Sequence, residues 1–455
     1  MSEDKFILDI KRLGINSEGI GYWRKKAVFV DNALPKEKIA VKVKEEKPNH
    51  ILAENIEIIQ ASSNREKPFC AYYDKCGGCQ NQHIKYEAGL QYKRETLLEA
   101  LKRYANVTAK DVLIRSVIGM KNPTNYRNKS SLPLRFKAGK TKMGLYQKNS
   151  NQLVEIESCP IHDQRLNKIN MEVCKLIDKM QIPVYDPKTK KGFIKFLITR
   201  IAYYTGEAQV TLILDKQYDC LKLAQEIFKI EGVSSVYQDI KQEDDSFNFF
   251  SGNLKLLWGE KTITEKLDKY QFKLLPDAFF QLNSQQTKVL YEEVKSATKL
   301  NKRDIVFDCY CGVGTISTYL ADSCLKVIGI DNNKDAIKNA ISNARLNNQT
   351  NMEFIAGDVE ATVRKLIVNY RKIDCLIVDP PREGLKHFLK LIEEIKPKKI
   401  IYISCNLSTL AKDLAILKKN YKIKEIQPVD MFPFSAILES VVILEYLATN
   451  KTIKT

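Results

Sequence analysis

Cys405 is the residue of this sequence best suited to act as a nucleophile. It lies in Ser404-Cys405-Asn406, between a β-branched and aromatic run at 399–403, which predicts a buried parallel strand, and residues 407–414, which have helical spacing. Ligands bind at the carboxyl edge of open α/β sheets, and the positive end of a following helix stabilises a thiolate. The alternative is a small buried core residue, because free cysteines are often buried. The neighbouring motifs must decide between the two.

A second group of cysteines has a spacing that suits a metal centre. Cys70, Cys76 and Cys79 are close in sequence, and the two glycines before Cys79 allow a turn tight enough for thiolates to converge. Cys159, in a Cys-Pro pair like the ending of some iron–sulfur runs, is the best candidate for a fourth ligand. Zinc also accepts four thiolates, although its structural sites usually show two close pairs. The spacing favours an iron–sulfur centre and leaves zinc open. Four isolated cysteines in apolar contexts are predicted to be core residues: Cys174, Cys220, Cys324 and Cys375.

A glycine-containing loop followed by acids indicates an adenosine ligand. The predicted strand 304–308 leads into Cys309-Tyr310-Cys311-Gly312-Val313-Gly314-Thr315, a helix begins at 316, and the next two strands end at Asp331 and Asp358. Glycines let the backbone approach a ligand, and an acid at the end of the second strand can accept hydrogen bonds from both ribose hydroxyls. No glycine occupies the third position of a dinucleotide loop, which favours S-adenosylmethionine over a nicotinamide dinucleotide.

Two further motifs add an acid and a base at the same edge. Asp379-Pro380-Pro381-Arg382 follows the predicted strand 373–378, and its two prolines make a rigid, non-helical platform. Such a platform resembles the substrate loop of methyltransferases that act on planar nitrogens, whereas Cys405 points to carbon. Glu439 lies near the start of the predicted last strand, 438–447, and is a candidate base.

These groups together suit methylation of carbon 5 of uracil. That carbon is a poor nucleophile until a thiolate adds to carbon 6 and creates an enolate, which then attacks the sulfonium methyl group. A base must afterwards remove the carbon 5 proton so that the thiol can leave. Cys405, Glu439 and the loop 308–315 supply a nucleophile, a base and a site for the methyl donor. A folded RNA would have to extrude the base to reach them.

Three predicted domains carry these motifs. Residues 1–60 alternate in short strands and predict a five-stranded, OB-like barrel, in which Tyr22 and Trp23 either stack on bases or fill the interior. Residues 61–274 predict a central α+β domain with a helix over 88–104. Its segment 125–146 interleaves basic and aromatic residues, which suits RNA contact, the alternative being a plain exposed hairpin. Residues 275–455 alternate strand and helix, which predicts a doubly wound, Rossmann-like α/β sheet.

The charge distribution points to a polyanion as partner. The chain has 455 residues, enough for two or three domains, and a formal net charge of +18. Residues 65–150 hold 18 Lys and Arg against 6 Asp and Glu, so two thirds of the excess lies in one fifth of the chain. RNA or DNA is the obvious partner, although solvated surface lysines would give the same count. With no signal peptide or membrane span evident, we expect a cytoplasmic protein with no obligate protein partner.

Taken together, the motifs resemble the S-adenosylmethionine-dependent RNA uracil-5 methyltransferases, including the iron–sulfur-containing 23S ribosomal RNA enzymes. The resemblance covers nearly the whole chain and implies a multidomain α/β protein with an N-terminal TRAM barrel, a central domain with a [4Fe-4S] cluster and a class I methyltransferase domain. It rests on motifs that follow the family's order: the four cysteines, Phe279-Phe280-Gln281-Leu282-Asn283, Asp308-x-Tyr310-Cys311-Gly312-x-Gly314, Asp379-Pro380-Pro381-Arg382, Ser404-Cys405-Asn406 and Asp430-Met431-Phe432-Pro433.

The resemblance implies a role for each motif residue. Cys405 would be the nucleophile and Glu439 the base. The cofactor, S-adenosylmethionine, would contact Gln281, Tyr310, Asp331 and Asp379. The cluster, a structural [4Fe-4S] centre, would be bound by Cys70, Cys76, Cys79 and Cys159. The expected substrate is a uridine in 23S ribosomal RNA, with transfer RNA as the runner-up.

The chain departs from the family pattern at two places. The family usually has Pro-His-Thr-x-His before the base glutamate, whereas this chain reads Pro433-Phe434-Ser435-Ala436-Ile437-Leu438-Glu439 and lacks both histidines. The second strand ends in Asp331, where glutamate is common. A rival hypothesis from another class therefore remains, namely an RNA-binding protein whose methyltransferase site has decayed. Methyl transfer separates the two hypotheses.

Overall fold

The computed structural model describes residues 5–242, 249–370 and 372–447. The chain forms two compact units, and neither is a continuous stretch of sequence. Unit 1 comprises residues 1–123, 380–394 and 400–455, and unit 2 comprises residues 124–379 and 395–399. The division into domains at residues 60 and 274 stays a prediction.

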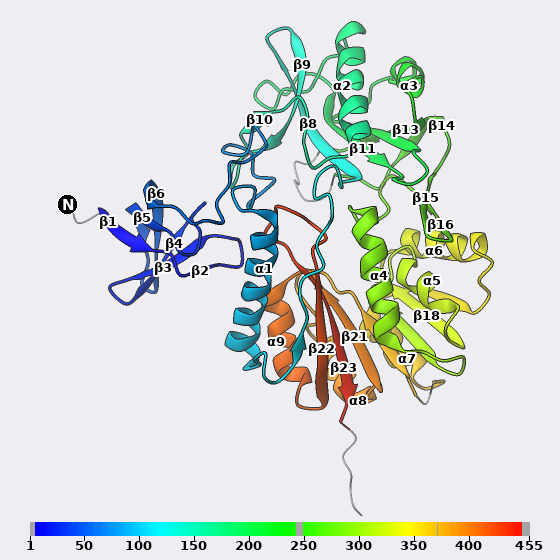
Figure 1. The fold of residues 1–455 in the computed structure, drawn as a ribbon. Helices are drawn as coiled ribbons and strands as arrows, with labels where there is room; N and C mark the ends of the chain where they lie inside the picture. The colour runs from blue at the N-terminus through cyan, green and yellow to red at the C-terminus, as the bar shows by residue number, and fades with distance from the viewer. Residues whose placement is uncertain (1–4, 243–248, 371, 448–455) are drawn as a thin grey trace, which may run out of the picture. The chain divides into compact units, whose positions relative to one another are not determined.

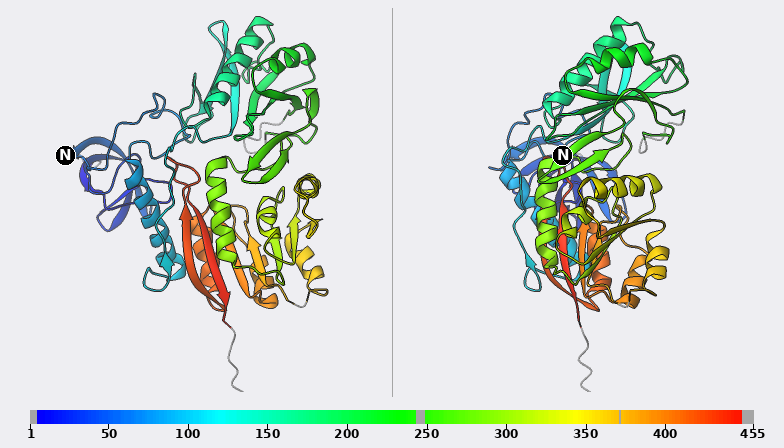
Figure 2. Two further views of the ribbon diagram at one scale, coloured as in Figure 1. Left: turned by 45° about the vertical axis from the view of Figure 1, so that its right-hand side comes forward. Right: turned by 90° about the vertical axis from the view of Figure 1, so that its right-hand side faces the viewer.

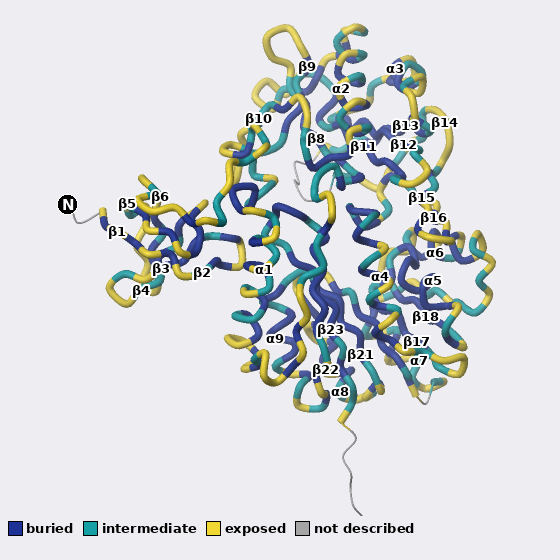
Figure 3. The backbone as a smooth tube through the Cα atoms, viewed as in Figure 1, coloured by how far each residue is buried: buried dark blue, intermediate teal, exposed yellow. Residues whose placement is uncertain are grey.

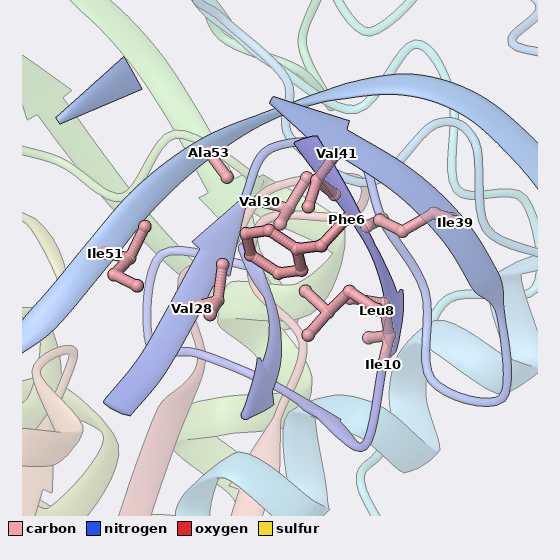
Figure 4. Packing of buried hydrophobic residues seen from close by; sticks show 10 residues of the cluster. Phe6, Leu8, Ile10, Val28, Val30, Ile39, Val41, Ile51 and Ala53 are labelled. Carbon is pink, nitrogen blue, oxygen red and sulfur yellow. The ribbon is translucent and has the colours of Figure 1, made fainter. Parts of the chain in front are cut away.

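The N-terminal part of unit 1 is a small β structure with its own core. Alternation along the first strand places Phe6 and Leu8 inside and Lys5, Ile7 and Asp9 outside. The inward residues of the other strands join them in one apolar cluster (Figure 4). Five main strands are accompanied by one strand of two residues, and the order is β1-β5-β6-β4-β3-β2. The six strands are β1 (Lys5–Asp9), β2 (Arg12–Leu13), β3 (Gly19–Trp23), β4 (Lys26–Val30), β5 (Lys38–Glu46) and β6 (His50–Gln60).

The two aromatic residues at the end of β3 have different environments. Trp23 stacks on Phe6 with ring centroids 4.2 Å apart and packs against the apolar cluster, and the Arg24 guanidinium lies 4.1 Å above its ring. Tyr22, by contrast, is 56% exposed. Trp23 therefore contributes to the core, and Tyr22 is the aromatic ring that a base could reach.

A long helix in unit 1 packs against this β structure. Leu13 and Leu34 form one buried cluster with Ile84, Ala88 and Tyr92 of the helical region. The expected helix over 88–104 is present as α1 (Tyr86–Ala100), continued by one wider π-helical turn, η1 (Leu101–Ala105). Asn106, in the left-handed conformation with φ 49°, ends it.

Unit 1 also contains the last strands of the chain. They are hydrogen-bonded neighbours in the order β21-β23-β22-β7, and β22 and β23 run antiparallel (Figure 1). The short β7 is parallel to β22, with Leu113 opposite Glu425 and Ile114 opposite Ile426. The elements are β7 (Leu113–Ile114), α8 (Phe388–Ile395), β21 (Lys399–Ser404), α9 (Leu407–Leu417), β22 (Tyr421–Val429) and β23 (Glu439–Tyr446).

Unit 2 begins with a seven-stranded sheet in the order β10-β9-β8-β11-β12-β13-β14. The helices α2 and α3 contact each other and pack against this sheet (Figure 2). The segment 125–146 contains β8 and β9, which form a hairpin, and β8 also pairs with β11 within the sheet, while RNA contact by this segment stays a prediction. The elements are β8 (Lys129–Lys137), β9 (Lys140–Tyr146), β10 (Leu153–Glu155), α2 (Gln164–Lys179), β11 (Ile194–Ile201), β12 (Ala208–Leu214), α3 (Leu221–Phe228), β13 (Val233–Ile240) and β14 (Lys255–Gly259).

The second half of unit 2 has the expected strand–helix alternation. Four parallel strands are neighbours in the order β19-β18-β17-β20, and the central ones are buried, as parallel strands covered on both faces should be (Figure 3). The elements are the hairpin β15 (Ile263–Leu267) and β16 (Tyr270–Leu274), then α4 (Ser284–Thr298), β17 (Ile305–Cys309), α5 (Thr315–Ala321), β18 (Lys326–Asp331), α6 (Lys334–Leu346), β19 (Met352–Ala356), α7 (Val359–Leu366) and β20 (Cys375–Val378). Throughout the described residues, helices are too short or too polar to cross a membrane.

Candidate active site

Cys405 occupies the short connection between β21 and α9, as the sequence predicts. Asn406 is the N-cap of α9, and its side-chain oxygen accepts hydrogen bonds from the backbone N–H groups of Ser408 at 3.1 Å and Thr409 at 3.4 Å. Cys405 itself is half-buried, unlike the fully buried strand before it. The thiol is therefore held beside a capped helix N-terminus and keeps access to solvent.

Within unit 1, the residues after the Asp-Pro-Pro motif are tied to the same helix. The side chains of Asn406 and Thr409 both donate to the Arg382 carbonyl, at 3.0 and 3.2 Å. Gly384 turns the chain with φ +78°, and a Cβ at this position would lie 2.6 Å from the Asp413 carboxylate. The platform segment is thus fixed to α9, the helix that begins directly after Cys405.

Glu439 is the first residue of β23, opposite Val429 of β22, and is 6% exposed. β23 and β21 are neighbours, so both candidate catalytic residues lie at the ends of adjacent strands. One small cavity is lined by Leu407, two residues after Cys405, and by Leu438, directly before Glu439. The structure therefore brings the two predicted catalytic positions into one region of unit 1.

The cysteine-rich segment of unit 1 is a loop with few regular elements. Cys70, Cys76 and Cys79 are half-buried, as is Cys159 in unit 2, whereas the cysteines predicted to be core residues are buried. Burial raises the pKa of the Cys76 thiol, and the nearby Cys70 raises this pKa further. Across the described residues, no three His, Cys, Asp or Glu side chains are grouped so that they could hold a metal ion. The four-cysteine centre is accordingly not confirmed.

The glycine-containing loop of unit 2 has the expected conformation for close approach of a ligand. Tyr310, Gly312 and Gly314 all have positive φ angles, of 66°, 55° and 79°. Asp331, at the end of β18, accepts the Gly312 N–H at 2.9 Å, and its other oxygen accepts the Asn333 N–H at 2.9 Å. Asp331 thus shapes the loop itself, a role that the sequence analysis did not assign to it.

Two carboxyl groups lie at the ends of the parallel strands of unit 2. Asp308 is fully buried, and burial raises its pKa to about 7 although its Oδ2 accepts a hydrogen bond from Ser317. Desolvation, followed by the charge of Asp308, raises the pKa of Asp379. One negative charge is therefore easier to hold in this pair than two, and a cationic ligand would favour ionisation of both groups.

Gln281 accepts a hydrogen bond from Asn128, a residue of the segment predicted to contact RNA. It is 7% exposed, and its carbonyl oxygen accepts a hydrogen bond from the Asn128 amide at 2.9 Å. The same amide donates to Ser284 at 2.9 Å. Asn128 lies in the segment predicted to contact RNA, but its amide supports the start of α4.

The predicted RNA-contact segment divides into buried and exposed parts. Tyr126 is 2% exposed, so its ring is not available for stacking, whereas Phe136 is 62% exposed. Lys129 lies directly opposite Arg200 on neighbouring strands, an arrangement that disfavours folding because like charges meet. Burial and the charge of Arg200 hold the pKa of Lys129 well below its usual range. The Arg200 guanidinium is buried and donates to the carbonyl oxygens of Leu275 and Ala278, so its hydrogen bonds go to the protein itself.

Three residues that order the site were not among the predicted site residues. Lys93 lies within the helix expected over 88–104, and it is buried and paired with Asp430. Gln80 and Asn81 follow the last loop cysteine and bond to residues 434–436. These contacts join residues more than 330 positions apart, so no local pattern could reveal them. The position of Gln80 and Asn81 directly after Cys79 was the one available signal.

Comparison with known proteins gives matches over nearly the whole chain. A family model described as tRNA (uracil-5-)-methyltransferase matches residues 85–447, and a TRAM domain model matches residues 7–54. A Halalkalibacterium halodurans protein, named as an uncharacterized RNA methyltransferase, is 41% identical over 447 residues, which cover 97% of this chain and 96% of the relative. A Clostridium tetani protein of the same name is 35% identical over 452 residues, covering 98% and 97%. The crystal structure of Pyrococcus abyssi tRNA (uracil-54, C5)-methyltransferase with S-adenosyl-L-homocysteine has a TM-score of 0.75 and 26% identity, covering 98% of this chain and 100% of that one.

Proposed function

This chain belongs to the tRNA (uracil-5-)-methyltransferase family of S-adenosylmethionine-dependent RNA methyltransferases, and from that premise we propose that it methylates carbon 5 of a uridine in 23S ribosomal RNA. The TRAM domain and the mixed α/β methyltransferase fold are part of the same assignment. The choice of RNA, the roles of single residues and the iron–sulfur cluster are the proposals that follow.

Cys405 and Glu439 would act in sequence in one unit. The Cys405 thiolate adds to carbon 6 of the uracil ring, and the resulting enolate attacks the sulfonium methyl group through carbon 5, which releases S-adenosylhomocysteine. Glu439 then takes the carbon 5 proton, the electron pair of that C–H bond re-forms the 5,6 double bond, and the thiolate leaves. The observation that carries this proposal is that Cys405 directly follows β21 and Glu439 begins β23, the neighbouring strand of the sheet.

S-adenosylmethionine would bind to unit 2 through Gln281, Tyr310, Asp331 and Asp379. Gly312 and Gly314, both with positive φ, place no side chain in the path of a ligand, as close approach of an adenosine group requires. The carboxylate of Asp379 would place a negative charge beside the positively charged sulfonium group. With its partners already fixed by the fold, such a site would need little rearrangement on binding.

For the substrate, 23S ribosomal RNA is supported by the cysteine pattern, which resembles that of the iron–sulfur-containing ribosomal RNA enzymes. Transfer RNA is the second candidate, because the Pyrococcus abyssi neighbour is a tRNA (uracil-54, C5)-methyltransferase. Either RNA would be met in the cytoplasm, which is the location we propose. The excess of positive charge within residues 65–150 suits both RNAs equally.

The test is to map every 5-methyluridine in ribosomal and transfer RNA from cells with the gene, without it, and with the Cys405→Ala variant. We expect one or more 23S positions to lose the methyl group in both altered strains. Loss only in transfer RNA would overturn the substrate and keep the chemistry. No loss in either strain would favour the RNA-binding protein with a decayed site.

We also propose that Cys70, Cys76, Cys79 and Cys159 bind a [4Fe-4S] cluster. The proposal is supported by exposure, since these four thiols and Cys405 are the partly exposed cysteines of the described chain and the others are buried. Protein purified without oxygen should contain about four iron and four sulfide per chain. Cys76→Ser should lose the iron, whereas Cys405→Ala, which alters a partly exposed cysteine outside the set, should keep it. Zinc without sulfide in the purified protein would contradict the proposal.

A further inference from the structure

Residues 430–438 form the segment that leads into Glu439, here called the base loop. It connects β22 to β23 and contains no helix or strand, so its position depends on bonds to other parts of the chain. Phe434 lies in the left-handed conformation with φ 63°, which costs free energy for a residue with a Cβ. A loop in this state persists only where its surroundings hold it.

Lys93 of α1 holds the base loop at both ends. Its ammonium group contacts the Asp430 carboxylate at 2.6 Å and the carbonyl oxygens of Phe432 at 3.1 Å and Ile437 at 2.8 Å. An ammonium group has three N–H donors, so all of them are used by this one loop. The Ile437 carbonyl is two residues from Glu439, and Asp430 directly follows β22.

The burial of this ion pair has no obvious value for stability alone. The side chains of Lys93 and Asp430 are 7% and 1% exposed, and removing two charges from water often costs as much as their attraction returns. An apolar pair at these positions would pack α1 against the loop equally well. An apolar pair could not donate hydrogen bonds to the two backbone carbonyls. This difference indicates that the ion pair serves to position the loop.

A second contact fixes the middle of the base loop. The Phe434 carbonyl oxygen accepts hydrogen bonds from the backbone N–H groups of Gln80 and Asn81, both at 2.9 Å. The Asn81 side chain donates to the Ser435 carbonyl at 3.0 Å, and the Ala436 N–H donates to the Gln80 side chain at 3.3 Å. The Asp430 end is also held by the Tyr86 hydroxyl, which donates to the carboxylate at 2.9 Å, so the contribution specific to Lys93 lies at the Ile437 end, beside Glu439.

We propose that Lys93 is a positioning residue for Glu439, which fixes the base loop so that the carboxylate meets carbon 5 of the uracil only in the productive orientation. The inference rests on the proposed function and deepens it, since it assigns to Lys93 the orienting role that the loop's own residues do not supply. Displacement of a catalytic group by about 1 Å can slow its step about 100-fold.

The proposal makes a prediction about one half of the reaction. Thiolate addition and methyl transfer need Cys405 and the cofactor, whereas proton removal and release of the thiol need Glu439. A displaced base therefore leaves the methylated RNA attached to Cys405. Because Lys93→Met alone would remove the cation beside the buried Asp430 carboxylate, the variant to use is Lys93→Met with Asp430→Asn.

The experiment uses the purified full chain, ribosomal RNA from the strain without the gene, and cofactor labelled in its methyl group. A denaturing gel measures labelled RNA bound covalently to protein, and mass spectrometry measures free 5-methyluridine. Wild type sets the limit of full product release, and Glu439→Gln sets the limit of adduct without release. Lys102→Met removes an exposed lysine just after α1 and controls for the loss of charge. We expect the double variant to release product about 10- to 100-fold more slowly and to accumulate the adduct, with S-adenosylhomocysteine affinity unchanged.

Hydrogen exchange gives a readout that does not depend on turnover. The amides of the base loop should exchange faster in the double variant than in wild type or Lys102→Met, while those of α9 stay protected. If the double variant forms less product only in proportion to its smaller folded fraction, and accumulates no extra adduct, the positioning role is overturned. An active wild type with no adduct in Glu439→Gln would also overturn it. A wild type that methylates no RNA would instead remove the proposed function, and the role of Lys93 with it.

Discussion

Alanine should lower stability more at Gly314 than at Gly312, and it should weaken cofactor binding more at Gly312 than at Gly314. Both glycines lie in the loop between β17 and α5 with positive φ, so alanine at either position incurs about 1–2 kcal/mol of backbone strain. Their surroundings differ. A Cβ on Gly312 would meet no atom within 4 Å, whereas one on Gly314 would lie 2.8 Å from the ring of Phe354 and 3.2 Å from Ala340.

The magnitudes follow from these contacts. Gly314→Ala adds an overpacking cost of about 1–3 kcal/mol to the backbone strain, which gives a total of about 2–5 kcal/mol. Gly312→Ala should lower the free energy of unfolding only by the backbone strain, about 1–2 kcal/mol. The open space beside Gly312 is where the proposed cofactor would approach the backbone, so its added methyl group should weaken S-adenosylhomocysteine binding by at least about 1.4 kcal/mol, a factor of ten.

The assay is a pair of measurements on each variant, urea unfolding at fixed pH and calorimetric titration with S-adenosylhomocysteine. Since a chain of two units need not unfold in one step, the transition of unit 2 is followed through exchange of the amides of β17 and α5. We expect Gly314→Ala to be the less stable variant and Gly312→Ala the weaker binder. Wild-type affinity in Gly312→Ala would refute the placement of the cofactor, and equal stability of the two variants would refute the steric argument.

Three further predictions concern charged or capping groups. Since the folded pKa of Asp308 is raised to about 7, the folded chain binds more protons than the unfolded chain from about pH 4 to 7, so this group's contribution to stability is lost as pH rises through that window and stays lost above it. Asp308→Asn should therefore stabilise the protein more at pH 8 than at pH 5 in urea unfolding. Asn406→Ala should cost about 1 kcal/mol through the lost cap, while Asn406→Asp keeps the cap and loses only the bond to Arg382, a difference that thermal unfolding can measure. Lys129→Gln should raise stability, because burial and the neighbouring charge of Arg200 disfavour an ammonium group at this position, and urea unfolding of the variant would measure the gain.

Local patterns predicted the regular elements of the methyltransferase region closely. The strand expected over 304–308 is β17 (Ile305–Cys309), and the helix expected to begin at 316 is α5 (Thr315–Ala321). These segments are buried β-branched runs or amphipathic helices bounded by Gly, Asp and Asn, so local sequence and tertiary structure favour the same answer. The position of Cys405 was predictable for the same reason, because a strand, a short polar connection and a capping asparagine are all visible in the sequence.

Long-range contacts were not predictable in this way. Tyr126 looks like an exposed aromatic among cations, but the packing of unit 2 buries it. Lys93 looks like a surface lysine of a helix, and only the distant Asp430 makes its burial tolerable. The cysteine spacing suggests a four-thiolate metal centre, which no grouping of His, Cys, Asp or Glu side chains among the described residues confirms. In each case the deciding neighbour lies far away in the sequence.

The pairing of β7 with β22 has a consequence for synthesis of the chain. Leu113 leaves the ribosome 312 residues before its partner Glu425, which at ordinary elongation rates is a delay of about 15–60 s. During that time α1 and η1 expose the surface that α9 will later cover, and Lys93 has not yet met its partner Asp430. Nascent chains of this protein should therefore depend on chaperones until the final residues emerge, and truncation before residue 425 should leave an aggregation-prone N-terminal part.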